Sequence, residues 1–501
     1  MQAREHYTHP QSERLHGLGR ILITGGASLV VGGLITYLNI SLPPGNAVAD
    51  PLIMGLAILT LIVVGLAIYA ERRWLVSLPV LVGLAFLGYP LGALSYALGW
   101  VEPTDAQIPV FSAHLQNHIY LVYALLLVLG GFMAWLSGYY LGLGRARTAP
   151  KVTPHSATID RGRLHRVVGA FALVGLVGLA LYYRGQGGLG NFIDNVALLR
   201  VVPVGTFYLS WIALLLPASS LFWLGMDYDR AVRNPWFWGL FATGFIALLS
   251  YGNRWAPGGY LLIAALLYYQ RQTSWKRATL PLLALAGAVV LLTVGVSAWR
   301  TLSMEEGDVQ LQAITARALS SLSFQDLLAL FVGQRNTTDV DLLAWITHNY
   351  SWGNLLWGRS LFDIPLMVVP RTLWPGKPVE LGIRLFQEYS GWYNVSNAWH
   401  PGMLGELFVN YHVFGVLLGG MLLGVLGGRV EKWRRSHQQE PATGLIYAVF
   451  AIKFALMGAI IGFMMPAIEF LVMAIPLCLG ARLVTGASNP TRSVFDHAHR
   501  H

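Results

Sequence analysis

Residues 370 to 415 hold the side chains best suited to chemistry on a phosphorylated substrate. The run Pro-Arg-x-x-Trp-Pro-x-Lys-Pro places Arg371 and Lys377 among prolines, with Trp374 between them. Proline fixes the backbone and removes donors, and tryptophan favours the headgroup level of a membrane. A guanidinium binds phosphate through two parallel hydrogen bonds, whereas lysine acts as a point charge. The run predicts either a phosphate-binding turn at a membrane edge or a purely structural proline-rich corner.

A carboxylate and an imidazole lie just beyond this run. His400 precedes Pro401, which suits the first turn of a helix, and Glu406 falls within the first two turns of that helix. Glu406 is expected either to complement the positive helix end or to orient and deprotonate a hydroxyl. His400 is expected to be either a cap residue or a general base. Both alternatives remain open for each side chain.

Further arginines lie where membrane proteins disfavour positive charge. Arg254 and Asn253 belong to a Ser-Tyr-Gly-Asn-Arg turn, in which glycine allows the backbone to approach a ligand closely. Three more arginines occupy the outer ends of apolar runs or outer loops, namely Arg184, Arg200 and Arg300. Each arginine is expected to be either a diphosphate ligand or an anchor whose stem lies along apolar surface while its charge reaches the interface.

The composition indicates a membrane protein without redox or metal chemistry. The 501 residues are 55% hydrophobic and only 12% charged, with 17 Trp and 55 Gly. Cys478 is the sole cysteine, which excludes a disulfide framework, a thiolate metal cluster and a cysteine redox pair. Asp339 and Asp341 have a DxD spacing, but their surroundings favour a helix N-terminus over a metal site. We therefore expect no metal and no cofactor.

Apolar runs of spanning length predict an all-α polytopic membrane protein with about 12 transmembrane helices. Basic residues fall on alternate connections, which places both termini in the cytoplasm, and the net charge of +10 then matches anionic lipid rather than nucleic acid. Lys453 and Glu469 lie within apolar runs, as functional charges or as members of structural ion pairs. The runs cover 21–42, 51–70, 75–99, 117–142, 167–183, 201–226, 236–252, 257–270, 279–299, 402–428, 444–465 and 467–486.

The chain is expected to form one domain with a single large periplasmic loop. Its parts are a cytoplasmic tail (1–20), nine transmembrane helices (21–299), the loop (300–401), three further transmembrane helices (402–486) and a second cytoplasmic tail (487–501). Apolar stretches in the loop at 323–332, 342–346 and 361–369 are too short to span and predict interfacial or re-entrant helices.

The proline-rich run, followed by Leu404-Gly405-Glu406-Leu407-x-x-Asn410 and Gly415, resembles the oligosaccharide repeat-unit polymerases, also called O-antigen (Wzy-type) polymerases. The turn at 252–254 is similar to a Gly-Ser-Arg turn of that family and of the related O-antigen ligases. The chain departs from the family pattern at Gly376, where an acid is common, and at Tyr411-His412, where a bulky residue and glycine are usual. His400 is similar to a catalytic ligase histidine, although Pro401 replaces the asparagine that follows it there.

The resemblance implies an inner-membrane glycosyltransferase of the GT-C type, with its active site facing the periplasm. It would be metal-independent and inverting, and would join undecaprenyl-diphosphate-linked oligosaccharides, as donor and acceptor, into O-antigen, capsule or exopolysaccharide. Membrane lipids and a chain-length-regulating membrane protein are further expected partners. The alternatives are an O-antigen ligase, which the proline-rich run disfavours, and a lipid-linked oligosaccharide flippase or other transporter, which the absence of an internal repeat disfavours.

Overall fold

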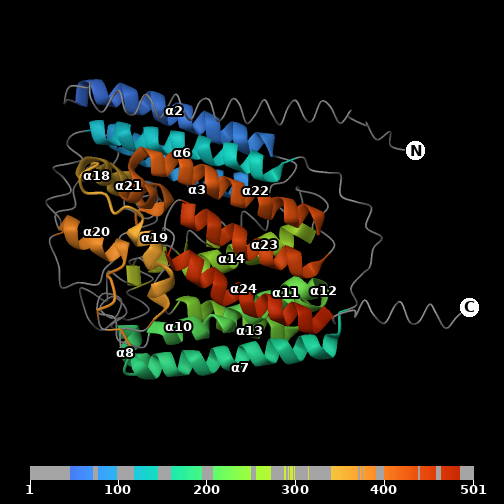
Figure 1. The fold of residues 1–501 in the computed structure, drawn as a ribbon. Helices are drawn as coiled ribbons and strands as arrows, with labels where there is room; N and C mark the ends of the chain where they lie inside the picture. Colours follow the sequence, from blue (N-terminus) through green and yellow to red (C-terminus); the bar gives the residue numbers. More distant parts are fainter. Residues whose placement is uncertain are drawn as a thin grey trace, which may run out of the picture.

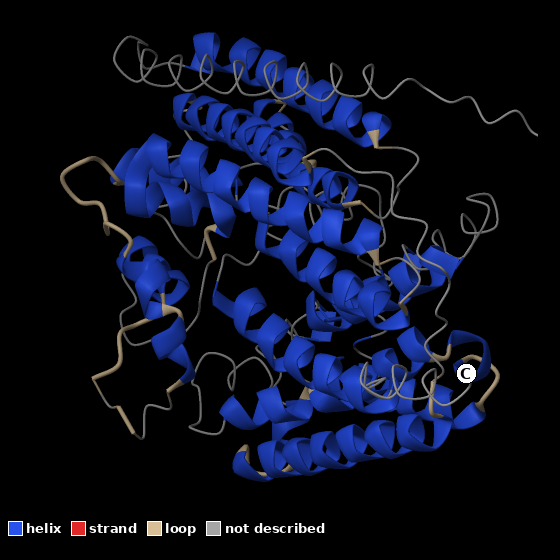
Figure 2. Ribbon diagram, turned by 45° about the vertical axis from the view of Figure 1, so that its right-hand side comes forward, coloured by secondary structure: helices blue, strands red, loops and turns tan. Residues whose placement is uncertain are grey.

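The structure, a computed structural model, is mainly helical in its described part, and no strand occurs there (Figure 2). The described residues are 46–71, 77–98, 118–144, 159–194, 207–249, 255–271, short pieces between 287 and 299, residue 314, 340–369, 373–374, 376–390, 400–437, 440–458 and 464–485.

Within these ranges, 7 helical stretches are long and apolar enough to cross a membrane. This is the architecture of a polytopic membrane protein. The stretches correspond to α2 (Asn46–Ala70), α3 with α4 (Leu78–Phe86 and Gly88–Ala97), α6 (Ile119–Leu143), α7 (Arg161–Gly185), α10 with α11 (Phe207–Ala213 and Leu215–Met226), α21 with α22 (Gly402–Phe414 and Gly420–Ser436) and α24 (Met464–Thr485).

Three more helices match predicted apolar runs but have fewer residues than these seven stretches, namely α13 (Pro235–Leu249, 15 residues), α14 (Trp255–Arg271, 17 residues) and α23 (Pro441–Leu456, 16 residues). Helix α7 begins before its apolar run and α22 continues past its own, because a helix satisfies its backbone internally whether its side chains are apolar or charged. The predicted run at 21–42 lies outside the described residues, and 279–299 is described only in short helical pieces.

The long helices lie side by side in layers (Figure 1). Helices α2, α3, α6 and α22 lie above α23, α14 and α24, and α10, α13 and α7 lie below. Arg435 at the end of α22 pairs with Glu71 at 3.3 Å, and Arg161 at the start of α7 lies 3.6 Å from Asp227. Ion pairs therefore join the ends of neighbouring long helices at one end of the bundle.

Helices α6 and α22 approach until their backbones touch. A Cβ atom added to Gly138 or Gly142 of α6 would lie 1.9 Å or 2.2 Å from a carbonyl oxygen of α22. The relation is reciprocal, since a Cβ on Gly424 or Gly428 of α22 would lie 2.0 Å or 2.1 Å from a carbonyl oxygen of α6. Between apolar helices in lipid, such close packing replaces the hydrophobic driving force.

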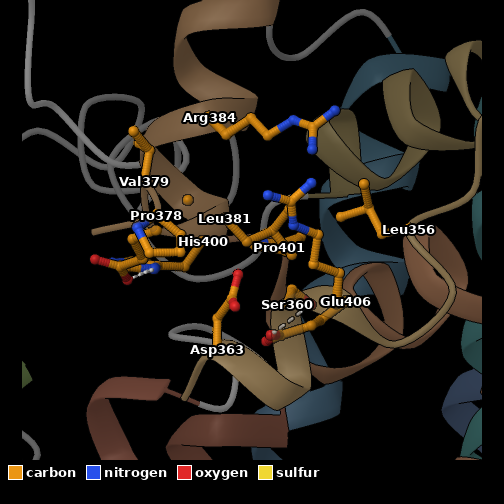
Figure 3. Close-up of a pocket in the computed structure, with 13 residues that line it drawn as sticks. Leu356, Ser360, Asp363, Pro378, Val379, Leu381, Arg384, His400, Pro401 and Glu406 are labelled. Carbon is orange, nitrogen blue, oxygen red and sulfur yellow. Dashed lines mark hydrogen bonds and ion pairs between the residues drawn. The ribbon is translucent and has the colours of Figure 1, made fainter. Parts of the chain in front are cut away.

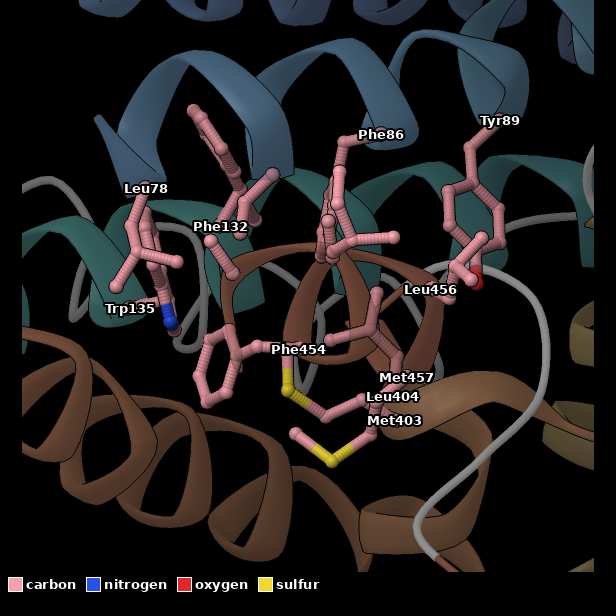
Figure 4. Close-up of a cluster of buried hydrophobic side chains, with 14 of the residues drawn as sticks. Leu78, Phe86, Tyr89, Phe132, Trp135, Met403, Leu404, Phe454, Leu456 and Met457 are labelled. Atoms are coloured by element: carbon pink, nitrogen blue, oxygen red, sulfur yellow. The ribbon is translucent and has the colours of Figure 1, made fainter. Parts of the chain in front are cut away.

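A buried cluster ties this helix pair to its neighbours. Phe132 of α6 packs on Phe86 of α3 with ring centres 5.2 Å apart and stacks on Trp135 at 6.1 Å, and Trp135 lies 6.3 Å from Phe454 of α23 (Figure 4). Leu404, fully buried at the start of α21, belongs to the same core. The first turns of α21 are thus held by the bundle.

Charges inside the bundle are paired. Glu431, fully buried, accepts hydrogen bonds from Arg434 at 2.5 Å, Arg435 at 2.8 Å and Tyr447 at 2.5 Å. Lys453 of α23 pairs with Glu469 of α24. The ion pair that one of the two alternatives for Lys453 and Glu469 expected is therefore present, and breaking such a pair would leave an uncompensated charge.

Short helices of the predicted loop lie at the opposite end of the bundle from α12 (Tyr228–Ala231) and the basic helix ends (Figure 1). They are α18 (Val340–Asn349), α19 (Arg359–Asp363), the 3-10 helix η3 (Pro365–Val368) and α20 (Leu381–Ser390). The expected short helices at 342–346 and 361–369 correspond to α18 and to α19 with η3, whereas 323–332 lies outside the described residues.

Candidate functional site

A break in the span that begins at Gly402 organises the site. Tyr411 and His412 leave helical geometry, and His412 takes a left-handed φ of 57°. Phe408 and Trp352 flank the His412 ring, with centres 4.4 Å and 4.7 Å away. Left-handed backbone is costly for a side chain with a Cβ, so this packing holds a strained conformation.

The break frees carbonyl groups that bind the loop before α19. Leu356 N–H donates to the Val409 carbonyl at 3.0 Å, and Trp357 N–H donates to the Asn410 carbonyl at 3.1 Å. Trp357 and Gly358 both have positive φ, which turns the chain sharply into α19. Backbone groups inside a span need partners, and the loop supplies them. The break therefore fixes α19 against α21.

A cavity of about 150 Å³ lies between α19, the start of α20 and the first turns of α21 (Figure 3). Its titratable and hydroxyl-bearing lining residues are Arg359, Ser360, Asp363, Glu380, Arg384, His400 and Glu406. Two guanidinium groups, three carboxyl groups, an imidazole and a hydroxyl thus face one small space. Such a lining suits a polar, anionic ligand that carries hydroxyl groups.

Glu406 is the buried carboxylate of this cavity, at 4% exposure. Ser360 Oγ donates to Glu406 Oε1 at 3.3 Å, and Asn410 Nδ2 donates to Ser360 Oγ at 2.7 Å. Asn410 is itself fully buried, one turn after Glu406. Ser360 therefore orients the carboxylate and is itself held by Asn410, as a base or a hydroxyl-binding group requires.

His400 and Glu380 form a second pair at the cavity wall, with Nδ1 3.5 Å from Oε1 (Figure 3). Burial raises the pKa of Glu380 from its usual 4.5 to about 7, and the nearby charge of Lys377 opposes this rise. A carboxyl group beside Nδ1 orients a histidine ring and selects its tautomer. Because its pKa is about 7, Glu380 changes its charge near neutral pH.

Two guanidinium groups and a further carboxylate complete the lining. Arg359 and Asp363 lie one turn apart on α19, and neither side chain has a hydrogen bond or ion pair among the residues that the structure describes. Arg384 of α20 reaches over the cavity and donates to Glu388 at 2.6 Å (Figure 3). Arg359 and Asp363 are consequently the groups best placed to meet a ligand's anionic and hydroxyl groups.

The residues predicted from the sequence separate into three groups. His400 and Glu406 come together in the cavity. Lys377 donates to the Val369 carbonyl at 3.0 Å, Trp374 is half-buried in the same loop, and Arg184 is exposed in the last turn of α7; these three do not line the cavity. The predictions for Arg200, Asn253, Arg254, Arg300 and Arg371 lie outside the described residues.

Most of the cavity's charged lining was missed by the sequence reasoning. Arg359 with Asp363, and Glu380 with Arg384, are charges spaced four residues apart that resemble the solvated faces of short helices. The spacing does place each pair on one helical face, and that was the available signal. Asn410 was noted only within a motif, and nothing in its neighbours marked it as a partner of Ser360.

Neither possible metal ligands nor comparison with known proteins assigns a function to the cavity. Across the described ranges, no group of three or more His, Cys, Asp or Glu side chains is placed to hold a metal ion, and Asp339 lies outside them. Comparison of the chain with protein-family models, with curated proteins and with solved structures found no match. The family resemblance therefore remains a prediction, and the function is argued from the cavity.

Proposed function

We propose that this protein is a glycosyltransferase of the bacterial inner membrane that polymerises undecaprenyl-diphosphate-linked oligosaccharide units at the periplasmic face. The observation that supports it best is the meeting of His400 and Glu406 in one cavity with Arg359 and Arg384. Residues chosen as bases from the sequence thus share a space with guanidinium groups able to bind a diphosphate. The full plan of about 12 spans and a GT-C fold belongs to this proposal.

The reaction is a single displacement at the anomeric carbon of the donor. A hydroxyl of the acceptor unit attacks this carbon, a cavity base takes the hydroxyl proton, and undecaprenyl diphosphate leaves with the electrons of the broken bond. Arg359 and Arg384 would stabilise the charge that develops on the diphosphate. One displacement inverts the anomeric configuration. Carboxylates such as that of Asp363 would accept hydrogen bonds from sugar hydroxyls. No step uses a metal ion.

Incubation of the purified protein with synthetic lipid-linked repeat units tests the proposal. We expect a ladder of products that persists after exhaustive chelation. Transfer of glycan to a lipid A core without a ladder would replace it by a ligase, and passage of the lipid-linked unit across vesicles without new glycosidic bonds would replace it by a flippase. Loss of turnover in EDTA with rescue by Mg²⁺ or Mn²⁺ would contradict the metal-free mechanism.

A further inference from the structure

Asn410, Ser360 and Glu406 form a chain of hydrogen bonds whose direction a backbone group fixes. Gly358 N–H can only donate, so the Asn410 atom that it meets at 3.0 Å is Oδ1. Asn410 Nδ2 must then face Ser360 Oγ at 2.7 Å and the Glu406 carbonyl at 2.8 Å, which uses both of its hydrogens. Ser360 Oγ, having accepted from Asn410, gives its own hydrogen to Glu406 Oε1 at 3.3 Å.

We infer that Asn410 and Ser360 are positioning residues that hold Glu406 in the acceptor role, so that Glu406 and not His400 takes the proton of the acceptor hydroxyl. This inference rests on the proposed function and deepens it. A general base must present a lone pair to the hydroxyl in a fixed geometry. The chain of hydrogen bonds meets that need, because the buried amide of Asn410 holds the Ser360 hydroxyl and this hydroxyl donates to Glu406.

The surroundings of the chain make it rigid. Asn410 lies directly before the helix break, and its carbonyl also binds Trp357 N–H at 3.1 Å. The loop that delivers Ser360 and the helix that carries Glu406 are thus joined by backbone and side-chain bonds at one place. His400, by comparison, is half-buried outside the helix and pairs across 3.5 Å with Glu380, whose charge changes near neutral pH.

Infrared spectroscopy tests this chain of hydrogen bonds without requiring catalytic turnover. The difference between wild type and Glu406→Gln at neutral pH isolates the carboxylate stretch of Glu406. We expect Ser360→Ala to shift this band and Ser360→Thr to preserve it, because threonine keeps the hydroxyl. Ser137→Ala is the matched control, since that buried hydroxyl lies outside the cavity lining and donates to the Met133 carbonyl at 2.9 Å. A band unmoved in Ser360→Ala, or found as a protonated carboxyl in wild type, overturns the inference.

Kinetics test the assignment of the base. We expect Glu406→Gln to lower kcat at least as much as His400→Ala, by roughly a hundredfold or more. Ser360→Ala should lower kcat about tenfold with little change in KM, with recovery in Ser360→Thr, at equal abundance in the membrane. Normal kcat in Ser360→Ala or in Glu406→Gln overturns the inference. If wild type forms no polymer, the proposed function and the base assignment both fail, while the infrared result still decides the hydrogen-bond chain.

Discussion

Among single residues, Arg359 has the geometry of a ligand contact rather than of a membrane anchor. Its guanidinium lines the cavity one helical turn from Asp363, and it has no side-chain partner within the described part of the chain. An anchoring arginine serves through its long stem and its charge, and lysine provides both. A bidentate phosphate contact requires the planar fork that only arginine has.

We predict that Arg359→Lys loses nearly as much polymer formation as Arg359→Ala, at least tenfold, at wild-type abundance. Ladder length and membrane abundance measured side by side provide the check. Arg230→Lys, at the opposite, basic end of the bundle, is the control and should stay active. A fully active Arg359→Lys would reduce Arg359 to a structural cation.

Glu380 gives the protein a pH dependence with a definite sign. Its pKa rises from 4.5 in the unfolded chain to about 7 because burial disfavours the charged form. A raised folded-state pKa contributes stability that is fully present below pH 4.5 and is lost as the pH rises towards 7. The charge of Lys377 opposes the rise in pKa and limits the loss, and His400 Nδ1 lies 3.5 Å from the carboxyl group.

We therefore predict that wild type loses thermal stability relative to Glu380→Gln when the pH is raised from 5 to 8. The measurement is the difference in Tm between the two proteins in detergent at each pH. Glutamine keeps the shape of the side chain but does not titrate, so the comparison isolates this carboxyl group. A Tm difference that stays constant across this range would contradict the assignment.

Among the elements, the broken span and the loop before α19 act as one unit. Gly358 has a φ of 86°, and a Cβ there would lie 2.0 Å from Tyr411 Oη. We predict that Gly358→Ala displaces α19 from α21, costs at least about 1 kcal/mol and abolishes activity. Gly353→Ala in the same loop is the control, because its nearest neighbour would be 4.0 Å away. Thermal unfolding and ladder formation measure the two effects, and equal behaviour of the variants would refute this role of the loop.

The sequence predicted the elements better than it predicted the site. Apolar runs specify spans because lipid tolerates few charges, so α2, α6, α7 and α24 appear where they were expected. The break at Tyr411-His412 was not foreseen, because the residues around it form an ordinary apolar pattern. Its stability comes from distant partners, namely Trp352 and the backbone of Leu356 and Trp357. Contacts of this kind depend on tertiary folding and leave no local signal.

At the scale of the whole molecule, the bundle separates two chemically different ends. Paired arginines and carboxylates such as Arg435 and Glu71 occupy one end, and the cavity helices α18 to α20 occupy the other (Figure 1). Basic residues are retained on the cytoplasmic side of membrane proteins. The cavity end is therefore expected to face the periplasm.

We predict that topology reporters fused after Thr148 and after Lys432 report the cytoplasm, and that one fused near Gln310 reports the periplasm. Alkaline phosphatase and green fluorescent protein fusions give opposite signals for the two compartments and check each other. A cytoplasmic signal at position 310 would place the cavity on the wrong side for a lipid-linked substrate and would remove the basis of the proposed function.

The reciprocal glycines of α6 and α22 also constrain how this protein can evolve. Every substitution at Gly138, Gly142, Gly424 or Gly428 adds at least a Cβ atom, and each such atom would meet a backbone oxygen at 2.2 Å or less. No single amino-acid replacement at these four positions therefore leaves the contact between the two helices unchanged. Among relatives of this protein, the four glycines at the contact between α6 and α22 are therefore expected to stay unchanged while exposed positions of the same helices vary.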